Sequence, residues 1–158
     1  MKPDGRVRMA NQYIVFVLDG QRYAMHLSAV DRVVRMVHIT PLSSAPDILL
    51  GVVDVGGRIV PVIDVRQRFN LPKRDLSLSD RLIFARTERR SVALVADAVT
   101  DVVECSEHSL VPADHIVRGL KHIEGIIRCE DGLILIHDLD TFLSLDEEQS
   151  LDLALGTS

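Results

Sequence analysis

The chain has 158 residues, 47% of them hydrophobic, which is enough to bury a sizeable core in one compact domain or in two small halves. No apolar run approaches the roughly 20 residues of a membrane span, and the polar start MKPDGR lacks the apolar core of a signal peptide, so we expect a cytoplasmic protein. The net charge of -5 argues against a nucleic-acid partner, because phosphate binding needs a concentrated basic surface.

The first predicted element is a β-hairpin. Two short apolar runs, Tyr13–Leu18 and Tyr23–Leu27, flank the turn sequence DGQR, in which Asp-Gly favours a tight turn. In Val30–Ile39 the valines fit helical spacing better than strand alternation, and we predict a short turn at Ser28–Asp31 followed by a strand. Proline and serine then gather in residues 40–47, which predicts a loop.

The central hairpin is the strongest local signal in the chain. Two β-branched runs flank Gly56-Gly57, a pair that accepts positive φ at both centres of a tight turn. Asp64 then suits the N-cap of a short helix whose apolar edge includes Phe69. Pro61 cannot donate a ladder hydrogen bond, so its strand should lie at a sheet edge or a barrel corner. The apolar residues next to Pro61 point to opposite faces of the sheet, so both faces of this strand should be covered.

The polar segment Leu71–Asp80 predicts a junction between two halves. Beyond the second set of strands, Asp138 suits the N-cap of another helix, which the tail from Asp146 either extends or leaves frayed, with Leu151 and Leu155 able to dock. The runs predicted as strands in this half are Arg81–Thr87, Ser91–Asp97, Ala98–Ser106, His122–Cys129 and Leu133–Asp138, with a polar loop over residues 107–115.

The two halves repeat one pattern. Sliding the chain on itself matches Phe16 with Phe84, Gly51 with Gly125 and, after the last strand of each copy, an aspartate with an aspartate. Two copies of a five-stranded unit predict an all-β fold of small antiparallel barrels with short helices and a C-terminal helix. We expect a tail (1–12), one domain (13–145) whose subdomains (13–72 and 73–145) are allowed to share strands or helices, and a helical extension or tail (146–158).

No enzyme signature is found: the sequence has no G-x-S-x-G elbow, no P-loop and no H-E-x-x-H. His108, His115 and His122 recur every seven residues, but no helix places them on one face and no thiol or carboxylate lies at ligand spacing, so a metal site is disfavoured. We expect no metal and no cofactor.

Three further candidates have simpler structural explanations. Asp64 and Asp138 occupy equivalent places in the repeats, so one capping role used twice explains them better than an acid and base pair. Cys105 and Cys129 form no CxxC motif, so buried free thiols are favoured over a bridge, a zinc site or a nucleophile. Two groups of arginines, Arg32 with Arg35 and the cluster at residues 86, 89 and 90, leave room for a local basic patch.

The segment GVVDVGGRIVPVIDVRQRF, preceded by ITPLSSAP and by YIVFVLDGQRYAM, resembles the CheW family of bacterial chemotaxis coupling proteins, whose signature is similar to G-V-x-N-L-R-G-x-I-V-P-V-x-D-L-R-x-R-F. The resemblance runs from about Tyr13 to Leu145. It implies two SH3-like five-stranded barrels and a scaffold without catalysis. It also implies two partners: the CheW-like regulatory domain of a CheA-type histidine kinase and the cytoplasmic tip of methyl-accepting chemoreceptors, within membrane-associated arrays.

The resemblance also places the candidate site residues. The family's turn Asn and Arg fall on Asp54 and Gly56, and its common Glu falls on Arg32, where the charge is reversed. The residues implied in protein interaction are Arg32, Val33, Arg35, Asp54, Val55, Gly56 and Arg58. The residues that carry the structural part of the motif are Gly51, Gly57, Pro61, Asp64, Phe69, Gly125 and Asp138.

These departures predict a divergent coupling protein that serves either a dedicated receptor and kinase set or a chemosensory pathway other than flagellar taxis. Two alternatives stay open at this point: a decoy that binds receptors without recruiting kinase, and a small-ligand-binding or enzymatic barrel protein that uses the groove between the halves.

Overall fold

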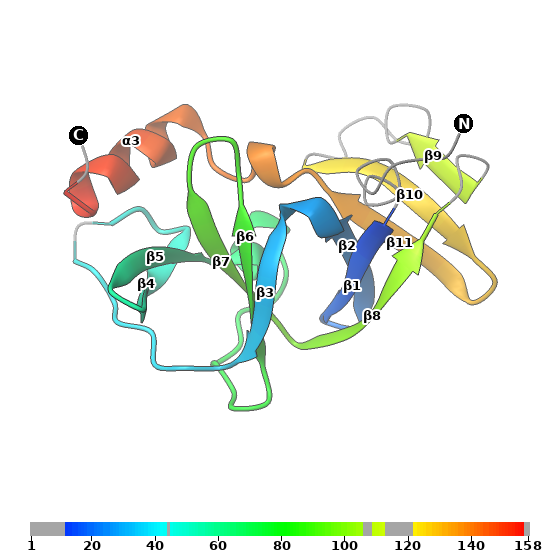
Figure 1. Cartoon of the computed structure of the whole chain (residues 1–158), viewed down its shortest axis with the longest axis horizontal. Helices are drawn as coiled ribbons and strands as arrows, with labels where there is room; N and C mark the ends of the chain where they lie inside the picture. The colour runs from blue at the N-terminus through cyan, green and yellow to red at the C-terminus, as the bar shows by residue number, and fades with distance from the viewer. Residues whose placement is uncertain (1–11, 44, 106–108, 113–121, 157–158) are drawn as a thin grey trace.

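The structure is a computed structural model that describes residues 12–43, 45–105, 109–112 and 122–156. Two β-sheets lie side by side, with short helices around them (Figure 1). They form two SH3-like barrels, as the sequence analysis expected, and we call them barrel A and barrel B.

Barrel A has six strands in the order β8-β1-β2-β11-β10-β9, and barrel B has five in the order β3-β6-β7-β5-β4. The three-residue strand β9 falls in a segment that we expected to be a polar loop. The strands of barrel A are β1 (Gln12–Leu18), β2 (Gln21–His26), β8 (Ala98–Glu104), β9 (Leu110–Pro112), β10 (Ile123–Cys129) and β11 (Gly132–His137). Those of barrel B are β3 (Val30–Arg35), β4 (Leu49–Val55), β5 (Arg58–Ile63), β6 (Arg81–Arg86) and β7 (Ser91–Ala96).

Each barrel combines strands from both repeats. In barrel A, the first two strands of the first copy, β1 and β2, join the last strands of the second copy. In barrel B, the first two strands of the second copy, β6 and β7, join the last strands of the first copy. The joins are the parallel pairs β2–β11 and β5–β7. Strands from either side of the expected boundary at residues 72 and 73 therefore occur in both barrels, which is the sharing that the sequence analysis allowed.

The two strongest hairpin predictions are confirmed. β1 and β2 pair around a turn in which Asp19 has φ +53° and Gly20 has φ +80°. β4 and β5 pair around Gly56 and Gly57, with φ +58° and +90°. Positive φ at both turn centres is the conformation that glycine and aspartate tolerate.

Strand β3 explains the irregular spacing of its valines. After the 3-10 turn η1 (Leu27–Ala29), the pairing of β3 with β6 shifts between Val30 and Arg32. This bulge inserts an extra residue, so Val30 and Val33 pack on the same core although they are three apart, and Val34 packs on the opposite side. A bulged strand therefore imitates helical spacing.

Pro61 does not lie in an edge strand, contrary to one of its two predicted settings. β5 lies between β4 and β7. Pro61 is opposite Val52, whose backbone N–H and carbonyl instead bond Thr40, and the pairing with β7 begins only at Val62. The missing N–H therefore breaks no ladder. Both faces of β5 are covered as expected, because Val62 packs inside barrel B and Ile63 packs on the core between the barrels.

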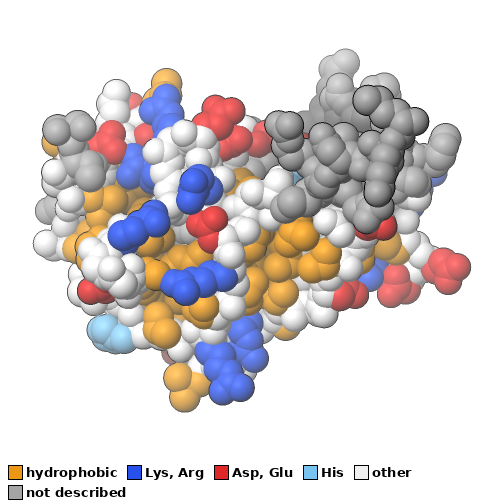
Figure 2. Space-filling model, viewed as in Figure 1, with side chains coloured by type: hydrophobic (Ala, Val, Ile, Leu, Met, Phe, Trp, Pro, Cys, Tyr) orange, Lys and Arg blue, Asp and Glu red, His pale blue; other side chains and the backbone are white. Residues whose placement is uncertain are grey.

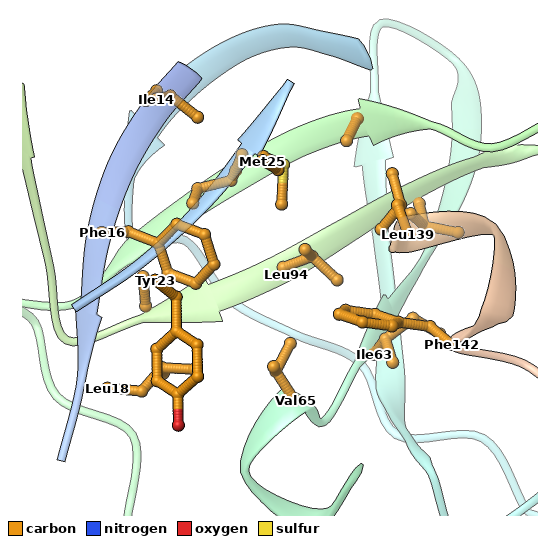
Figure 3. Packing of buried hydrophobic residues seen from close by; sticks show 14 of the residues in the cluster. Ile14, Phe16, Leu18, Tyr23, Met25, Ile63, Val65, Leu94, Leu139 and Phe142 are labelled. Carbon is orange, nitrogen blue, oxygen red and sulfur yellow. The ribbon is translucent and has the colours of Figure 1, made fainter. Parts of the chain in front are cut away.

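A single apolar core lies between the two barrels, and we call it the shared core. Figure 3 shows Phe16 and Tyr23 from barrel A, Leu94 and Ile63 from barrel B, and Phe142 pointing into the same space. Each barrel also has its own interior cluster. The buried members of the shared core are Ile14, Phe16, Leu18, Tyr23, Met25, Ile48, Ile63, Val65, Ile83, Ala85, Val92, Leu94, Ala96, Leu139 and Phe142.

The helices bear out one predicted cap and not the other. Asp64 caps α2 (Val65–Arg68), because its Oδ1 accepts a hydrogen bond from the Gln67 backbone N–H at 3.2 Å. Asp138 precedes only a 3-10 turn, η4 (Leu139–Thr141), and makes no side-chain cap. Burial, with the Glu124 and Asp140 carboxylates, raises the Asp138 pKa. Asp138 therefore differs from Asp64, which occupies the equivalent position in the first repeat.

A separate helix, α3 (Leu145–Ala154), begins at a capping box of Ser144 and Glu147 and lies beside barrel B (Figure 1). Its Leu151 is fully buried, as predicted for a docked tail. Arg90, from the β6–β7 turn, bonds the buried Glu148 carboxylate at 2.8 Å. No helix in the described part of the chain is long and apolar enough to cross a membrane.

His137 lies in a box of aromatic rings at the shared core. Its ring centroid is 4.4 Å from Phe69, 4.7 Å from Tyr23, 4.9 Å from Phe142 and 5.1 Å from Phe16. Among the described residues, neither ring nitrogen has a hydrogen-bond partner. Burial, with a smaller effect of His122, holds the His137 pKa well below its usual range, so the folded protein keeps this ring neutral.

The backbone at Gly51 predicts an asymmetry between the repeats. Gly51 has φ +155°, and a Cβ there would lie 2.4 Å from the Thr40 carbonyl oxygen. Gly51→Ala should therefore lower the free energy of unfolding by about 2–3 kcal/mol. Gly125→Ala, the matched control, should cost less, because its nearest atoms are 3.2 Å away. Urea denaturation compares the two, and equal losses would contradict the close approach.

His137 predicts a pH dependence of stability. The unfolded histidine takes up a proton below about pH 6.5, whereas the folded ring resists it. Stability is therefore full above pH 6.5 and falls as the pH drops below it, by up to about 1.4 kcal/mol per pH unit. His137→Leu should flatten this part of the curve. Chemical denaturation from pH 5 to 8 measures it, and an unchanged slope in the variant would refute the assignment.

Candidate site at the mouth of barrel B

Strand β3 places Arg32, Val33 and Arg35 in different surroundings. In the described chain β3 is the end strand of barrel B and pairs with β6. Arg32 is exposed, with its guanidinium carbon 5.5 Å from the centre of the Phe84 ring. Val33 packs on the shared core, and Arg35 is exposed opposite Arg81. Val33 therefore contributes to packing, whereas the two arginines face solvent.

The β4–β5 turn holds the other expected residues. The Asp54 Oδ1 accepts a hydrogen bond from the Gly57 backbone N–H at 2.8 Å, which closes the turn as Asp side chains commonly do. A side chain added at Gly56 would meet nothing within 4 Å, but its φ of +58° is one that residues other than glycine rarely adopt. Gly56 leaves the turn tip bare, and Asp54 stabilises it.

A groove of about 270 Å³ opens at the end of barrel B where this turn lies, and we call it the barrel B mouth. All five strands contribute to it. Three expected interaction residues line it, namely Arg32, Val55 and Arg58, whereas Val33, Arg35, Asp54 and Gly56 do not. The remaining lining residues are Asp31, Val60, Phe84, Arg86 and Ser91.

Sequence reasoning missed the residues that β6 and β7 bring to the mouth. Phe84 had been matched to Phe16 as a repeat position, and Arg86 belonged to the unassigned arginines. Their place in the groove follows from the pairing of β3 with β6, in which Arg32 is opposite Phe84. Only this long-range register joins the two basic groups noted in the sequence.

The mouth carries more positive than negative charge. Arg58 donates to the Ser91 hydroxyl at 2.9 Å, and Arg86 is 3.9 Å from the carboxylate of Asp31. Arg32 makes no ion pair with any described residue. Figure 2 shows basic side chains gathered over the strands of barrel B, with apolar side chains between them. Such a site suits a partner group that is anionic and able to accept several hydrogen bonds.

A second groove, of about 480 Å³, lies between α2 and the loop before β6. Its acids and bases balance, and Arg66 and Arg74 both bond Asp97, at 2.7 and 2.6 Å. None of the expected interaction residues lines it. Its two arginines are paired within the chain, so the mouth is the stronger candidate.

The thiol and histidine candidates gain no catalytic setting. Cys105 is a buried thiol inside barrel A, and burial, with Cys129 nearby, raises its pKa, which opposes a thiolate nucleophile. Within the described residues, no group of three or more His, Cys, Asp or Glu side chains could hold a metal ion. His108 and His115 lie outside the described residues.

The hydrogen bond of Asp54 predicts a structural role at the turn. Asp54→Ala should lower the free energy of unfolding by about 1 kcal/mol, because the Gly57 N–H loses its acceptor. Asp54→Asn, which keeps an acceptor oxygen, should recover most of the loss. Thermal denaturation of the three proteins tests this, and a neutral Asp54→Ala would leave the carboxylate without a role in the turn.

Comparison with known proteins is consistent with this architecture. The CheW-like domain model matches residues 12–147. The chemotaxis protein CheW of Bacillus subtilis is 27% identical over 146 residues, covering 91% of this chain and 94% of that protein. The CheW protein of Rhizobium meliloti is 24% identical over 141 residues, covering 88% and 91%.

A solved structure gives the same result for the fold. The crystal structure of the scaffolding protein TtCheW from Thermoanaerobacter tengcongensis superposes with a TM-score of 0.80 at 29% identity, covering 88% of this chain and 96% of that one. Since the family model spans most of the sequence, this chain belongs to the CheW family and is a coupling adaptor of chemotaxis signalling.

Proposed function

We propose that this adaptor couples methyl-accepting chemoreceptors to a CheA-type histidine kinase without catalysing a reaction, in the cytoplasm beside receptor arrays. The family match supports the coupling role. The observation that carries the kinase side is the barrel B mouth, because it gathers Arg32, Val55 and Arg58 from separate strands into one groove.

The kinase contact is assigned to the mouth and to the bare turn beside it. A partner that docks there meets the exposed Arg32 guanidinium and the tip at Gly56, which are two of the positions where the chain departs from its family's signature. The third departure, Asp54, lies within the turn and holds it in shape. We therefore propose that Arg32 and Gly56 select a dedicated kinase.

Binding to purified partners tests this function. The chain should bind the regulatory domain of a CheA-like kinase from the same cell, and it should bind a receptor fragment that contains the cytoplasmic tip. Calorimetry or co-elution measures both. Absence of any kinase complex would contradict the coupling role, and receptor binding without kinase binding would instead identify a decoy.

The double variant Arg32→Glu, Gly56→Arg tests the assigned surface. It should weaken binding of the cognate kinase by about tenfold or more, because Arg32→Glu replaces an attractive charge contact by a repulsive one and Gly56→Arg adds a bulky side chain at the turn tip. The control is Arg128→Glu, an exposed position on β10 of barrel A, which should leave kinase affinity unchanged. Equal affinity of the double variant and the wild type would remove the mouth from the kinase contact.

A further inference from the structure

We propose that the barrel B mouth recognises an acidic segment of its protein partner, in which a carboxylate lies beside an aliphatic side chain. This deepens the proposed function and, for the identity of the partner, rests on it. The starting observation is the contrast between the arginines of the mouth and the paired arginines elsewhere in the molecule.

Outside the mouth, several arginines are neutralised within the chain. Arg66 and Arg74 bond Asp97, Arg68 bonds Glu147, and Arg90 bonds Glu148 at 2.8 Å. The carboxylates in this protein outnumber the bases, 23 to 18. An acidic chain therefore has carboxylates available for pairing with arginine and uses them at several positions.

The mouth gathers three arginines with much less of this pairing. Its Arg32, Arg58 and Arg86 share one lining carboxylate, Asp31, at 3.9 Å from the nearest guanidinium nitrogen. Arg58 is oriented by the Ser91 hydroxyl instead of an acid. Three guanidinium groups at one groove with one carboxylate leave a local excess of positive charge, which attracts an external anion.

The floor of the mouth is apolar. Phe84 lies under the Arg32 guanidinium, and Val55 and Val60 complete the lining from the two strands of the central hairpin. Val60 and Phe84 are largely buried, so an inserted group would gain apolar contact as well as charge. This combination favours a protein side-chain pair over a phosphodiester chain, because the sugar carbons of a nucleic-acid backbone carry oxygens and offer no alkyl side chain to fill an apolar floor.

The size of the groove agrees with this occupant. Its volume of about 270 Å³ is just below the roughly 300–1,000 Å³ of small-molecule pockets, so it suits one or two inserted side chains. The net charge of -5 repels a large polyanion elsewhere on the surface. A carboxylate would pair with the arginines of the mouth, and an aliphatic neighbour would pack on its apolar floor.

Two matched peptides test the charge preference directly. The acidic probe is acetyl-Gly-Glu-Val-Glu-Leu-Glu-Gly-amide, and the control replaces its glutamates with lysines. In NMR spectra of the whole protein, the acidic probe should shift the Nε–H signals of Arg32, Arg58 and Arg86, and the lysine probe should not. Raising the salt from 50 to 300 mM should weaken this binding about fivefold or more.

Substitutions at the mouth provide the second test of the charge preference. The triple variant Arg32→Gln, Arg58→Gln, Arg86→Gln should lose the acidic probe, and Arg128→Gln should bind it as the wild type does. All substitutions are at exposed positions, and melting temperatures confirm that the fold is kept. Equal shifts with both peptides, unchanged binding by the triple variant, or tighter binding of a single-stranded DNA 12-mer would each overturn the proposal.

The kinase separates this inference from the coupling function. If Arg32→Glu weakens kinase binding tenfold and an acid-to-lysine change in the kinase restores it, the acidic contact is supported. If wild type and variant bind kinase equally, the inference fails while the coupling function stands. If no kinase binds but the acidic probe still occupies the mouth, the coupling function fails and the inference stands.

Discussion

The packing between the two barrels is the interaction on which the rest of the structure depends. Phe16 and Leu94 sit in strands that are buried on both faces, because β1 and β7 each turn alternate side chains toward a barrel interior and toward the shared core. The first two strands of each repeat thus become the centre of the molecule, and the third strands, β3 and β8, become exposed edges. The burial of the other strands in the shared core therefore determines that β3 and β8 supply exposed surface for partners.

Much of the local structure could be predicted from the sequence, because the signals are short-range. The two hairpins follow from their turn residues, and the cap at Asp64 follows from one side chain and the helix beside it. The exchange of strands could not be predicted in the same way, because alternation shows that a strand is buried on a face but does not show which strand pairs with it. Asp138 precedes only a three-residue 3-10 turn and makes no side-chain cap, although the same residue type at the equivalent place of the first repeat caps an α-helix.

The residues of the candidate site also fall into two groups: those expected from the sequence and those that only the fold reveals. The interaction residues expected from the family resemblance included Arg32 and Arg58, which both line the mouth, but also Val33 and Asp54, whose side chains serve packing and turn closure. A signature records which residue types recur, and both structural and binding residues recur. The residues it omitted reach the mouth through β6 and β7, and only the three-dimensional pairing reveals them. Of the arginines that looked unassigned in the sequence, Arg32 and Arg86 reach the mouth, whereas Arg90 is paired with Glu148 on α3.

The exchange of strands has a mechanical consequence for an adaptor. In a protein built from two barrels in series, a pull between partners on different barrels would load only the linker that joins them. Here the chain passes from barrel A to barrel B and back. Within each barrel, a parallel strand pair, β2–β11 or β5–β7, joins strands of the two repeats. Separating the barrels would strain both chain crossings, at η1 and at Asp97, and would expose the shared core, so the molecule should transmit displacement as one stiff body. A component that relays small movements between a receptor and a kinase benefits from that rigidity.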